Sequence, residues 1–266
     1  MLAGERRVRI LERVANQQPI EVAPLARLFA VSEMTIRRDI QRLERDGFLR
    51  RTYGGATAHV TRSFDLAFNA RALQKSVEKR LIAIAAAKLA AGAQSLFLGI
   101  GTTAEQFARC LPSRPSLTVV TNSLPIGSFL GTRSMRVVLL GGTVRRDELS
   151  CVGPAAAGTL QRYHFELAVL GAARISARDG VTDVNDDEAD VHRLAIANAD
   201  RVMVIADGSK IGGVAMASVC PITDVDTLVT DASASAAELE AIKALGVHVV
   251  VATAAQREEL SETFAE

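Results

Sequence analysis

The spacing of hydrophobic residues changes partway along the chain. Near the N-terminal end, apolar residues recur every three or four positions, which is the period of an amphipathic helix. From about residue 77 onward, short uninterrupted apolar runs alternate with helical stretches. Such runs are typical of parallel strands that helices cover on both faces. The pattern therefore predicts a small helical module followed by a larger α/β module with a parallel sheet.

The small module is predicted to begin with two helices. The first covers residues 5–17, and its apolar stripe consists of Val8, Leu11, Val14 and Ala15. The second repeats the same spacing with Leu25, Leu28 and Phe29. Both helices are expected to turn these stripes toward a common core.

A third predicted helix extends from its N-cap Ser32 to about Asp46. One face carries Ile36, Ile40 and Leu43 and is expected to be buried. The other side and its margins carry longer polar side chains and one methionine: Met34, Thr35, Arg37, Arg38, Gln41, Arg42 and Arg45. Asp39 and Glu44 are expected to orient neighbouring arginines.

A glycine turn, Tyr53-Gly54-Gly55-Ala56, follows Arg50 and Arg51 and predicts a small hairpin with basic flanks. Two helices joined by a tight turn and followed by such a hairpin form a winged helix-turn-helix pattern. The second helix of that motif reads base edges in the major groove, and the hairpin arginines contact the DNA backbone. The alternative interpretation is a solvated basic face on an ordinary helical subdomain.

Charge is distributed unevenly along the 266 residues. The whole chain has 31 Lys and Arg against 30 Asp and Glu, a net charge of +1. Residues 1–62, however, contain 12 Arg, no Lys and 7 acidic residues, whereas the remainder is mildly acidic. A basic module joined to an acidic one indicates a nucleic-acid partner for the first part.

The large module is predicted to contain seven buried strands, at 95–99, 117–121, 137–141, 167–171, 202–206, 227–230 and 247–252. Helical stretches lie between several of them, including 103–111, 188–199 and 236–245. An alanine-rich stretch, 81–91, is predicted to be a buried helix. The fold class is therefore α/β, with a Rossmann-like parallel-sheet domain after the DNA-binding module.

The first of these strands ends in a glycine loop, Gly99-Ile100-Gly101-Thr102-Thr103-Ala104, which opens a helix. The string matches G-x-G-x-x-A, so a dinucleotide site is one interpretation. That site also needs an acid at the end of the next strand, where this chain has Thr121-Asn122-Ser123. The simpler prediction is an anion site made of backbone N–H groups and two threonine hydroxyls.

Three further loops follow predicted strands and are expected to converge with the glycine loop on one ligand, because the carboxyl ends of parallel strands share an edge. They are Thr121–Ser123, Gly141–Thr143 and Asp207–Lys210. Lys210 supplies a cation suited to phosphate. Taken singly, each glycine pair is explained as a tight turn and Lys210 as a solvated charge; together they favour a phosphorylated ligand.

The residues around the third helix resemble the signature of the DeoR family of bacterial transcription regulators. The resemblance rests on residues 31–40 (VSEMTIRRDI), on Leu43-Glu44 and Gly47, and on residues 53–56 (YGGA). Later motifs continue it in order: Lys79 with Ile82-Ala83, Gly101-Thr102-Thr103, Thr121-Asn122-Ser123, Gly141-Gly142, Val152-Gly153-Pro154, Glu188-Ala189 and Asp207–Lys210. The likeness thus covers nearly the whole chain.

This resemblance implies a sensor domain similar to ribose-5-phosphate isomerase and a regulator, in most cases a repressor of carbohydrate operons, released from DNA by a phosphorylated sugar or related metabolite. The predicted DNA-binding residues are Ser32, Met34, Thr35, Arg37, Arg38, Arg42 and Arg51. The predicted effector-binding residues are Gly101, Thr102, Thr103, Thr121, Asn122, Ser123, Gly141, Gly142, Glu188 and Lys210. Among the effector residues, Thr102, Thr103, Asn122, Glu188 and Lys210 are carried over from the family motifs.

Several positions depart from the family pattern. Gly99 stands where an aspartate is usual, His192 where a lysine is common, Tyr53 where a histidine is usual, and Met34 where a polar residue is common. His192 is either a structural histidine or a donor to phosphate when protonated. Met34 offers apolar contact and so favours a thymine methyl in the operator.

A sugar-phosphate isomerase carrying a DNA-binding appendage is the competing function. Glu188 is the candidate base for such a reaction, but no second acid completes a catalytic constellation. The prediction is therefore a non-enzymatic regulator without cofactor or metal, since His59, His164, His192 and His248 lack ligand spacing with acids or cysteines. Cys110, Cys151 and Cys220 are isolated, which favours ordinary thiols in a reducing compartment.

The expected organisation is a DNA-binding domain at 1–58, a linker at 59–76 and an effector domain at 77–266. No apolar run approaches the length of a membrane span, so a cytoplasmic location without membrane contact is predicted. The partners are a double-stranded operator, a phosphorylated sugar and further copies of the chain. A homo-oligomer is expected because two half-sites call for at least a dimer.

Overall fold

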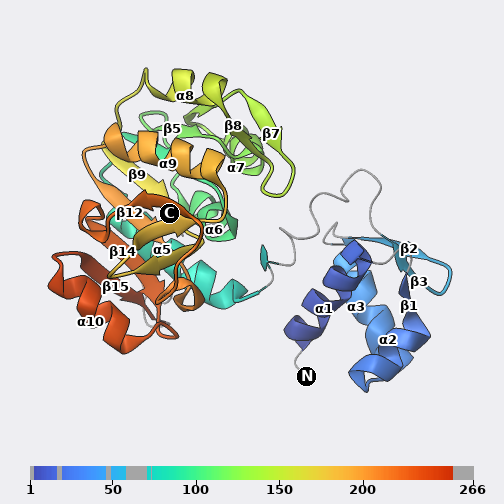
Figure 1. Cartoon of the computed structure of the whole chain (residues 1–266). Helices are drawn as coiled ribbons and strands as arrows, with labels where there is room; N and C mark the ends of the chain where they lie inside the picture. Colours follow the sequence, from blue (N-terminus) through green and yellow to red (C-terminus); the bar gives the residue numbers. More distant parts are fainter. Residues whose placement is uncertain (1–2, 17–19, 46–48, 58–70, 73, 254–266) are drawn as a thin grey trace. The chain divides into compact units, whose positions relative to one another are not determined.

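The computed structural model describes residues 3–16, 20–45, 49–57, 71–72 and 74–253 (Figure 1). Contacts divide the chain into two compact units, Met1–Ser76 with Arg146–Glu148, and Val77–Arg145 with Leu149–Glu266. The first unit has one hydrophobic core and the second has two, one on each face of its large sheet. Most of the predicted linker, 59–76, and the predicted helix end at Asp46 and Gly47 lie outside the described residues.

The described residues of the first unit include the helices α1, α2 and α3 and a three-stranded sheet (Figure 1). The helices are α1 (Ala3–Asn16), α2 (Val22–Phe29) and α3 (Glu33–Arg45). The strands are β1 (Ile20–Glu21), β2 (Arg50–Thr52) and β3 (Gly55–Thr57), in the antiparallel order β1-β3-β2. This arrangement is a winged helix-turn-helix, as the sequence pattern predicts.

The core of the first unit is built from the predicted helix stripes with one exception. Leu11 and Val14 of α1, Leu25 and Phe29 of α2, and Ile36, Ile40 and Leu43 of α3 are all buried. Leu28 is 52% exposed, so its prediction as a core position is wrong. The side chains of Val8 and Ala15 lie outside the described residues.

The strand β1 was not predicted from the sequence. It has only two residues, Ile20 and Glu21, and pairs with Ala56 and Gly55. A pair of residues is too short to produce a period, so hydrophobic patterning carries no signal for it. Gly55 is needed for this pairing, since a Cβ there would lie 1.8 Å from the Ile20 carbonyl oxygen.

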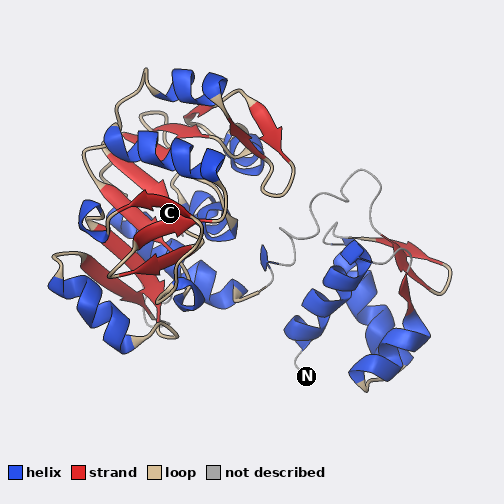
Figure 2. Ribbon diagram, in the orientation of Figure 1, coloured by secondary structure: helices blue, strands red, loops and turns tan. Residues whose placement is uncertain are grey.

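The second unit is organised around a seven-stranded parallel sheet in the order β15-β14-β12-β9-β4-β5-β6. Figure 2 shows strands in red and helices in blue. Its strands are β4 (Ser95–Leu98), β5 (Thr118–Thr121), β6 (Arg136–Leu139), β9 (Leu167–Leu170), β12 (Val202–Ile205), β14 (Thr227–Asp231) and β15 (His248–Ala252). These are the seven predicted strands. The central β9 and β12 are buried throughout, which explains their uninterrupted apolar sequences.

Helices cover both faces of this sheet. One face packs against α5 (Ser76–Leu89), α6 (Thr102–Cys110) and α7 (Leu124–Leu130). The other packs against α8 (Pro154–Leu160), α9 (Asp186–Ala197) and α10 (Ala236–Ala244). Alternate strand residues enter the two cores: Leu96 and Leu98 of β4 join the first, and Phe97 joins the second.

Two smaller sheets and two short helices complete the second unit. One sheet is the hairpin of β7 (Thr143–Arg145) and β8 (Ser150–Val152); the other consists of β10 (Arg174–Ser176), β11 (Gly180–Asp183) and β13 (Ala217–Cys220). The helices are the 3-10 turns η1 (Gly208–Lys210) and η2 (Ile222–Asp224). Within the described parts of the chain, no helix is both long and apolar enough to cross a bilayer.

We expect Gly55→Ala to destabilise the first unit by about 1–3 kcal/mol, because the new methyl group forces β1 away from β3. Urea unfolding of the full chain, followed by circular dichroism, measures the change. Gly4→Ala in α1 is the control, since a methyl group there meets nothing within 4 Å. Equal stability of the two variants would contradict the close approach of the strands.

Candidate functional site

The N-terminus of α3 is fixed by Ser32. Its Oγ accepts a hydrogen bond from the Thr35 backbone N at 3.2 Å and lies 2.9 Å from the Thr35 Oγ1. This is the N-cap that the sequence predicts, and it orients the first turn of the helix. Next to it, the Met34 side chain is 59% exposed and projects from the same turn.

A buried ion pair anchors α3 to α1. The Nε of Arg6 lies 2.6 Å from an Asp39 carboxylate oxygen, and both side chains are almost fully buried. Asp39 therefore does not orient the arginines of its own helix, and that expectation is wrong. Its buried charge is compensated by Arg6, so the pair fixes the position of α3 within the unit.

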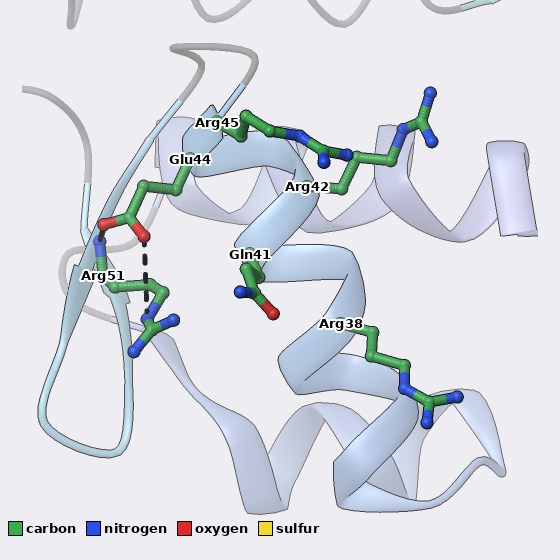
Figure 3. Close-up of a pocket in the computed structure, with 6 residues that line it drawn as sticks. All are labelled: Arg38, Gln41, Arg42, Glu44, Arg45 and Arg51. Carbon is green, nitrogen blue, oxygen red and sulfur yellow. Dashed lines mark hydrogen bonds and ion pairs between the residues drawn. The ribbon is translucent and has the colours of Figure 1, made fainter.

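Arginines line one exposed side of α3 together with the hairpin. The surface has a hollow of about 470 Å³ there, lined by Arg38, Gln41, Arg42, Glu44, Arg45 and Arg51. Figure 3 shows these six side chains. Glu44 accepts a hydrogen bond from the Arg51 backbone N at 3.0 Å and lies 3.7 Å from the Arg51 Nε. Glu44 thus orients an arginine, as predicted, and ties the end of α3 to β2.

The lining of this hollow is strongly basic, with four guanidinium groups and one carboxylate. The side chains of Arg38 and Arg42 extend away from the helix in Figure 3. Arg37 is also exposed and lies 3.5 Å from Glu33 in a surface ion pair, which contributes little stability and leaves the side chain able to change partners. Such a surface suits the phosphates of a nucleic-acid strand.

In the second unit, the predicted anion loop lies at the carboxyl end of β4. Gly101 is the residue before α6 and has φ +112°, a conformation that favours glycine. Thr102 and Thr103 form the first turn and are largely buried. The loop therefore presents the backbone N–H groups of a helix N-terminus at the sheet edge, which is the geometry that attracts an anion.

The three residues at the end of β5, Thr121, Asn122 and Ser123, make different hydrogen bonds. Thr121 accepts from the Ser123 backbone N at 3.1 Å, and Ser123 Oγ accepts from Ile126 N at 3.3 Å as the N-cap of α7. These hydroxyls stabilise the local turn. Asn122, between them, is fully buried and donates from Nδ2 to a Glu188 oxygen at 3.0 Å.

Glu188 is the centre of a buried polar cluster. Its carboxylate accepts hydrogen bonds from Asn122, from the Ser150 hydroxyl and from the Arg145 Nη1, the last at 3.0 Å. Its side chain is fully buried, and Arg145 neutralises its charge. The sequence did not predict Arg145 or Ser150, which come from the β7–β8 hairpin.

Cysteine chemistry is suppressed around this cluster and elsewhere. Burial and the nearby Glu188 carboxylate raise the pKa of the Cys151 thiol. Burial likewise raises the pKa of Cys110, and raises that of Cys220 to about 12, with a further contribution from Asp224. All three cysteines are therefore neutral thiols at neutral pH.

The remaining predicted loops also lie at this edge. Gly142 has φ +138°, and a Cβ there would lie 2.4 Å from the Val152 carbonyl oxygen, so hairpin packing explains this glycine. Gly141 is exposed and a Cβ there would meet nothing within 4 Å. At the end of β12, Gly208 N donates to Asp231 at 2.7 Å, which holds the loop that carries Lys210.

Two observations concern the dinucleotide site and the metal site considered from the sequence. The end of β5, which would carry the acid of a dinucleotide site, presents the Asn122 amide instead. Across the described residues, no group of three or more His, Cys, Asp and Glu is arranged to hold a metal ion.

Comparison with known families identifies the chain. The family model described as the DeoR-like helix-turn-helix domain matches residues 6–62, and the DeoR C terminal sensor domain matches residues 74–232. The protein therefore belongs to the DeoR family of transcriptional regulators.

Among its relatives, the HTH-type transcriptional regulator GlpR of Haloferax volcanii is 33% identical over 250 residues, which cover 94% of this chain and 98% of that protein. The glycerol-3-phosphate regulon repressor of Escherichia coli is 30% identical over 233 residues, 87% of this chain and 92% of that one. Ribose 5-phosphate isomerase A from Methanocaldococcus jannaschii aligns with 50% of this chain and 53% of its own, at 19% identity and a TM-score of 0.37.

We expect Glu188→Ala to destabilise the second unit by about 3 kcal/mol or more, because it removes the buried carboxylate that accepts hydrogen bonds from Asn122, Ser150 and Arg145. Chemical unfolding of the full chain measures the loss. Asp187→Ala is the matched control, since Asp187 is an exposed acid one residue away. Similar losses for both variants would contradict the central place of Glu188.

Proposed function

We propose that this DeoR-family regulator is a repressor that binds its operator through the first unit and is released by a phosphorylated sugar or related metabolite bound to the second. The observation that carries the proposal is the arginine-lined surface of α3. Ser32 caps this helix, and the buried Arg6–Asp39 ion pair holds it against α1. Two relatives support the repressor role, one described as a glycerol-3-phosphate regulon repressor and the other as a putative aga operon transcriptional repressor.

On the DNA side, residues near the start of α3 are assigned to base edges. Ser32 and Thr35 hold the first turn, and the exposed Met34 offers an apolar contact to a thymine methyl. Arg37 and Arg38 are assigned to bases or adjacent phosphates, while Arg42 and Arg51 are assigned to the backbone. Two half-sites require at least a dimer, so we propose a homo-oligomer.

On the effector side, the phosphate is assigned to Gly101, Thr102 and Thr103 with the Lys210 cation. Lys210 follows β12, which lies two strands from β4, or about 10 Å at the usual strand spacing. A phosphorylated ligand of a few carbon atoms spans such a distance. Gly141, Thr121 and Ser123 stay in the proposed site as loop residues at the same edge, although the two hydroxyls already serve the local turn.

A regulator is favoured over an isomerase by the state of Glu188. Both oxygens of this carboxylate accept hydrogen bonds from the chain itself, and Arg145 neutralises it. A general base needs an oxygen within reach of a substrate proton. We therefore assign Glu188 to holding Asn122 and the hairpin in place rather than to chemistry or direct contact with the ligand.

The β7–β8 hairpin offers a route from the ligand to the DNA-binding unit. Arg145, at the end of β7, contacts Glu188 within the second unit, and Glu148, three residues later, pairs with Arg71 within the first. A ligand that moves Arg145 therefore also acts on Glu148, the partner of Arg71, because only two residues separate Arg145 from Glu148 in the chain. Since a ligand shifts an equilibrium only by differential affinity, the effector must favour the arrangement that binds DNA poorly.

We propose residues 1–58 and 77–266 as the two functional domains, joined by a linker at residues 59–76.

We expect the double variant Arg37→Ala, Arg38→Ala to lose operator affinity. Removing an arginine that contacts a base lowers the binding free energy by about 1–3 kcal/mol. Removing one that contacts a phosphate also weakens the dependence of DNA affinity on salt concentration. An operator is first selected from random duplex DNA with the wild-type chain and then titrated at several salt concentrations. Arg178→Ala, whose side chain is 92% exposed in the second unit, controls for charge; wild-type affinity of the double variant would overturn the assignment.

We expect Thr103→Ala and Lys210→Ala to bind the selected operator normally and to resist release by sugar phosphates, because each lacks part of the proposed phosphate site. Fluorescence titration of labelled operator, with and without a panel of sugar phosphates, measures release. Lys243→Ala on α10 is the control, since its ammonium pairs with Glu240 on the surface. Release of both variants at wild-type effector concentrations would place the phosphate elsewhere.

A further inference from the structure

His192 is a buried histidine whose ring is not used by the protein itself. It lies on α9, four residues after Glu188, and is 1% exposed. Among the described residues, neither Nδ1 nor Nε2 has a hydrogen-bond partner. A structural histidine in a core normally pairs at least one nitrogen, because burying an unpaired polar group costs stability.

The Nε2 edge of this ring faces Gly99 at the carboxyl end of β4. A Cβ on Gly99 would lie 3.0 Å from Nε2, which is closer than most real Cβ contacts. Two residues that are 93 positions apart in the sequence therefore meet in space. The same Cβ position lies 3.4 Å from the Leu170 Cδ2, so Leu170 borders this point as well. Gly101, with φ +112°, lies two residues further on. Because His192 is 1% exposed, contact between Nε2 and a ligand in the anion loop requires residues 99–101 to shift.

A second unpaired acceptor lies on the neighbouring strand. Asn122 is fully buried, its Nδ2 is engaged by Glu188, and its Oδ1 has no partner in the described part of the chain. β4 and β5 are adjacent in the sheet, so Gly99 and Asn122 follow neighbouring strand ends. The same edge thus holds a buried imidazole and a buried amide oxygen, both unsatisfied.

We propose that His192 and Asn122 bind hydroxyl groups of the effector, and that Gly99 is required because any side chain there blocks the imidazole. A neutral imidazole offers one donor and one acceptor, and the amide oxygen accepts, so a hydroxyl group satisfies either one. A second anionic group is disfavoured there, since it would face the Asn122 oxygen beside Glu188. The ligand class is accordingly a phosphorylated polyol or sugar. This inference rests on the proposed function, which supplies the phosphate position.

The test compares His192→Leu, which removes both nitrogens, with His192→Gln, which keeps a donor and an acceptor. Calorimetry on the full chain measures the affinities for inorganic phosphate, glycerol 3-phosphate and ribose 5-phosphate. We expect at least one organic phosphate to bind wild type on the order of tenfold more tightly than inorganic phosphate. His192→Leu abolishes this preference while His192→Gln keeps part of it.

A second variant keeps the test independent of folding defects at position 192. Gly99→Ala should lose the same preference and retain affinity for inorganic phosphate, whereas Gly92→Ala, where a methyl group meets nothing within 4 Å, behaves as wild type. Melting temperatures add a distinct readout. Replacing an unpaired buried ring by leucine leaves the unliganded protein at least as stable, whereas a structural histidine would lose stability on replacement.

Three results overturn the inference: His192→Leu or Gly99→Ala keeps the preference, the unliganded His192→Leu protein is clearly less stable, or wild type binds no organic phosphate better than inorganic phosphate. Operator binding by the same samples separates this failure from that of the proposed function. If the wild-type chain binds the selected operator, the proposed function as a DNA-binding regulator stands even when the inference about His192 fails. If the wild-type chain does not bind any operator, the proposed function itself is rejected.

Discussion

The carboxylate of Glu188 holds together three segments that are far apart in sequence. It joins α9 to Asn122 at the end of β5 and, through Arg145 and Ser150, to the β7–β8 hairpin. A buried carboxylate is costly unless it is paired and hydrogen-bonded, so this arrangement is strongly constrained. The position of the amide at the sheet edge, and of the hairpin beside it, depends on that single charge.

Placing a charge at this edge also explains how the second unit can respond to a ligand. The loop that we propose for the phosphate and the buried polar cluster share one end of the parallel sheet, where strand ends converge. The hairpin then leads from Arg145 to Glu148, which pairs with Arg71. In the first unit, the buried Arg6–Asp39 pair and the Ser32 cap fix α3 in a comparable way. DNA contact and ligand contact are thus assigned to surfaces that separate buried charges hold in place.

The sequence predicts much of this architecture because its signals are local. The seven apolar runs became the seven strands of the parallel sheet, and Ser32 and the stripe of Ile36, Ile40 and Leu43 defined α3. The two-residue β1 has no period to detect, and Leu28 fits a helical stripe yet lies on the solvent side. The spacing of apolar residues in a sequence predicts which residues share one side of a helix. It does not show how far around the helix the core extends.

Long-range pairing explains why the site was predicted only in outline. The strand-end motifs predicted Asn122 as a site residue, and the family resemblance predicted Glu188. Their direct hydrogen bond and the contribution of Arg145 depend on tertiary structure. The same is true of Asp39, whose partner lies 33 positions earlier, and of Gly99 and His192. Two unusual residues in one sequence carry no sign that they are neighbours.

Hydrogen exchange by mass spectrometry on the wild-type chain, with operator alone and with an effective sugar phosphate, tests the central claim most directly. The account predicts that DNA protects the amides of residues 33–45 and 50–53. It predicts that the sugar phosphate protects residues 99–105 and changes exchange in the 143–152 hairpin. The result that would contradict an effector site in the second unit is protection of α3 and of Arg50 and Arg51 in β2 by the sugar phosphate itself, with no change at residues 99–105.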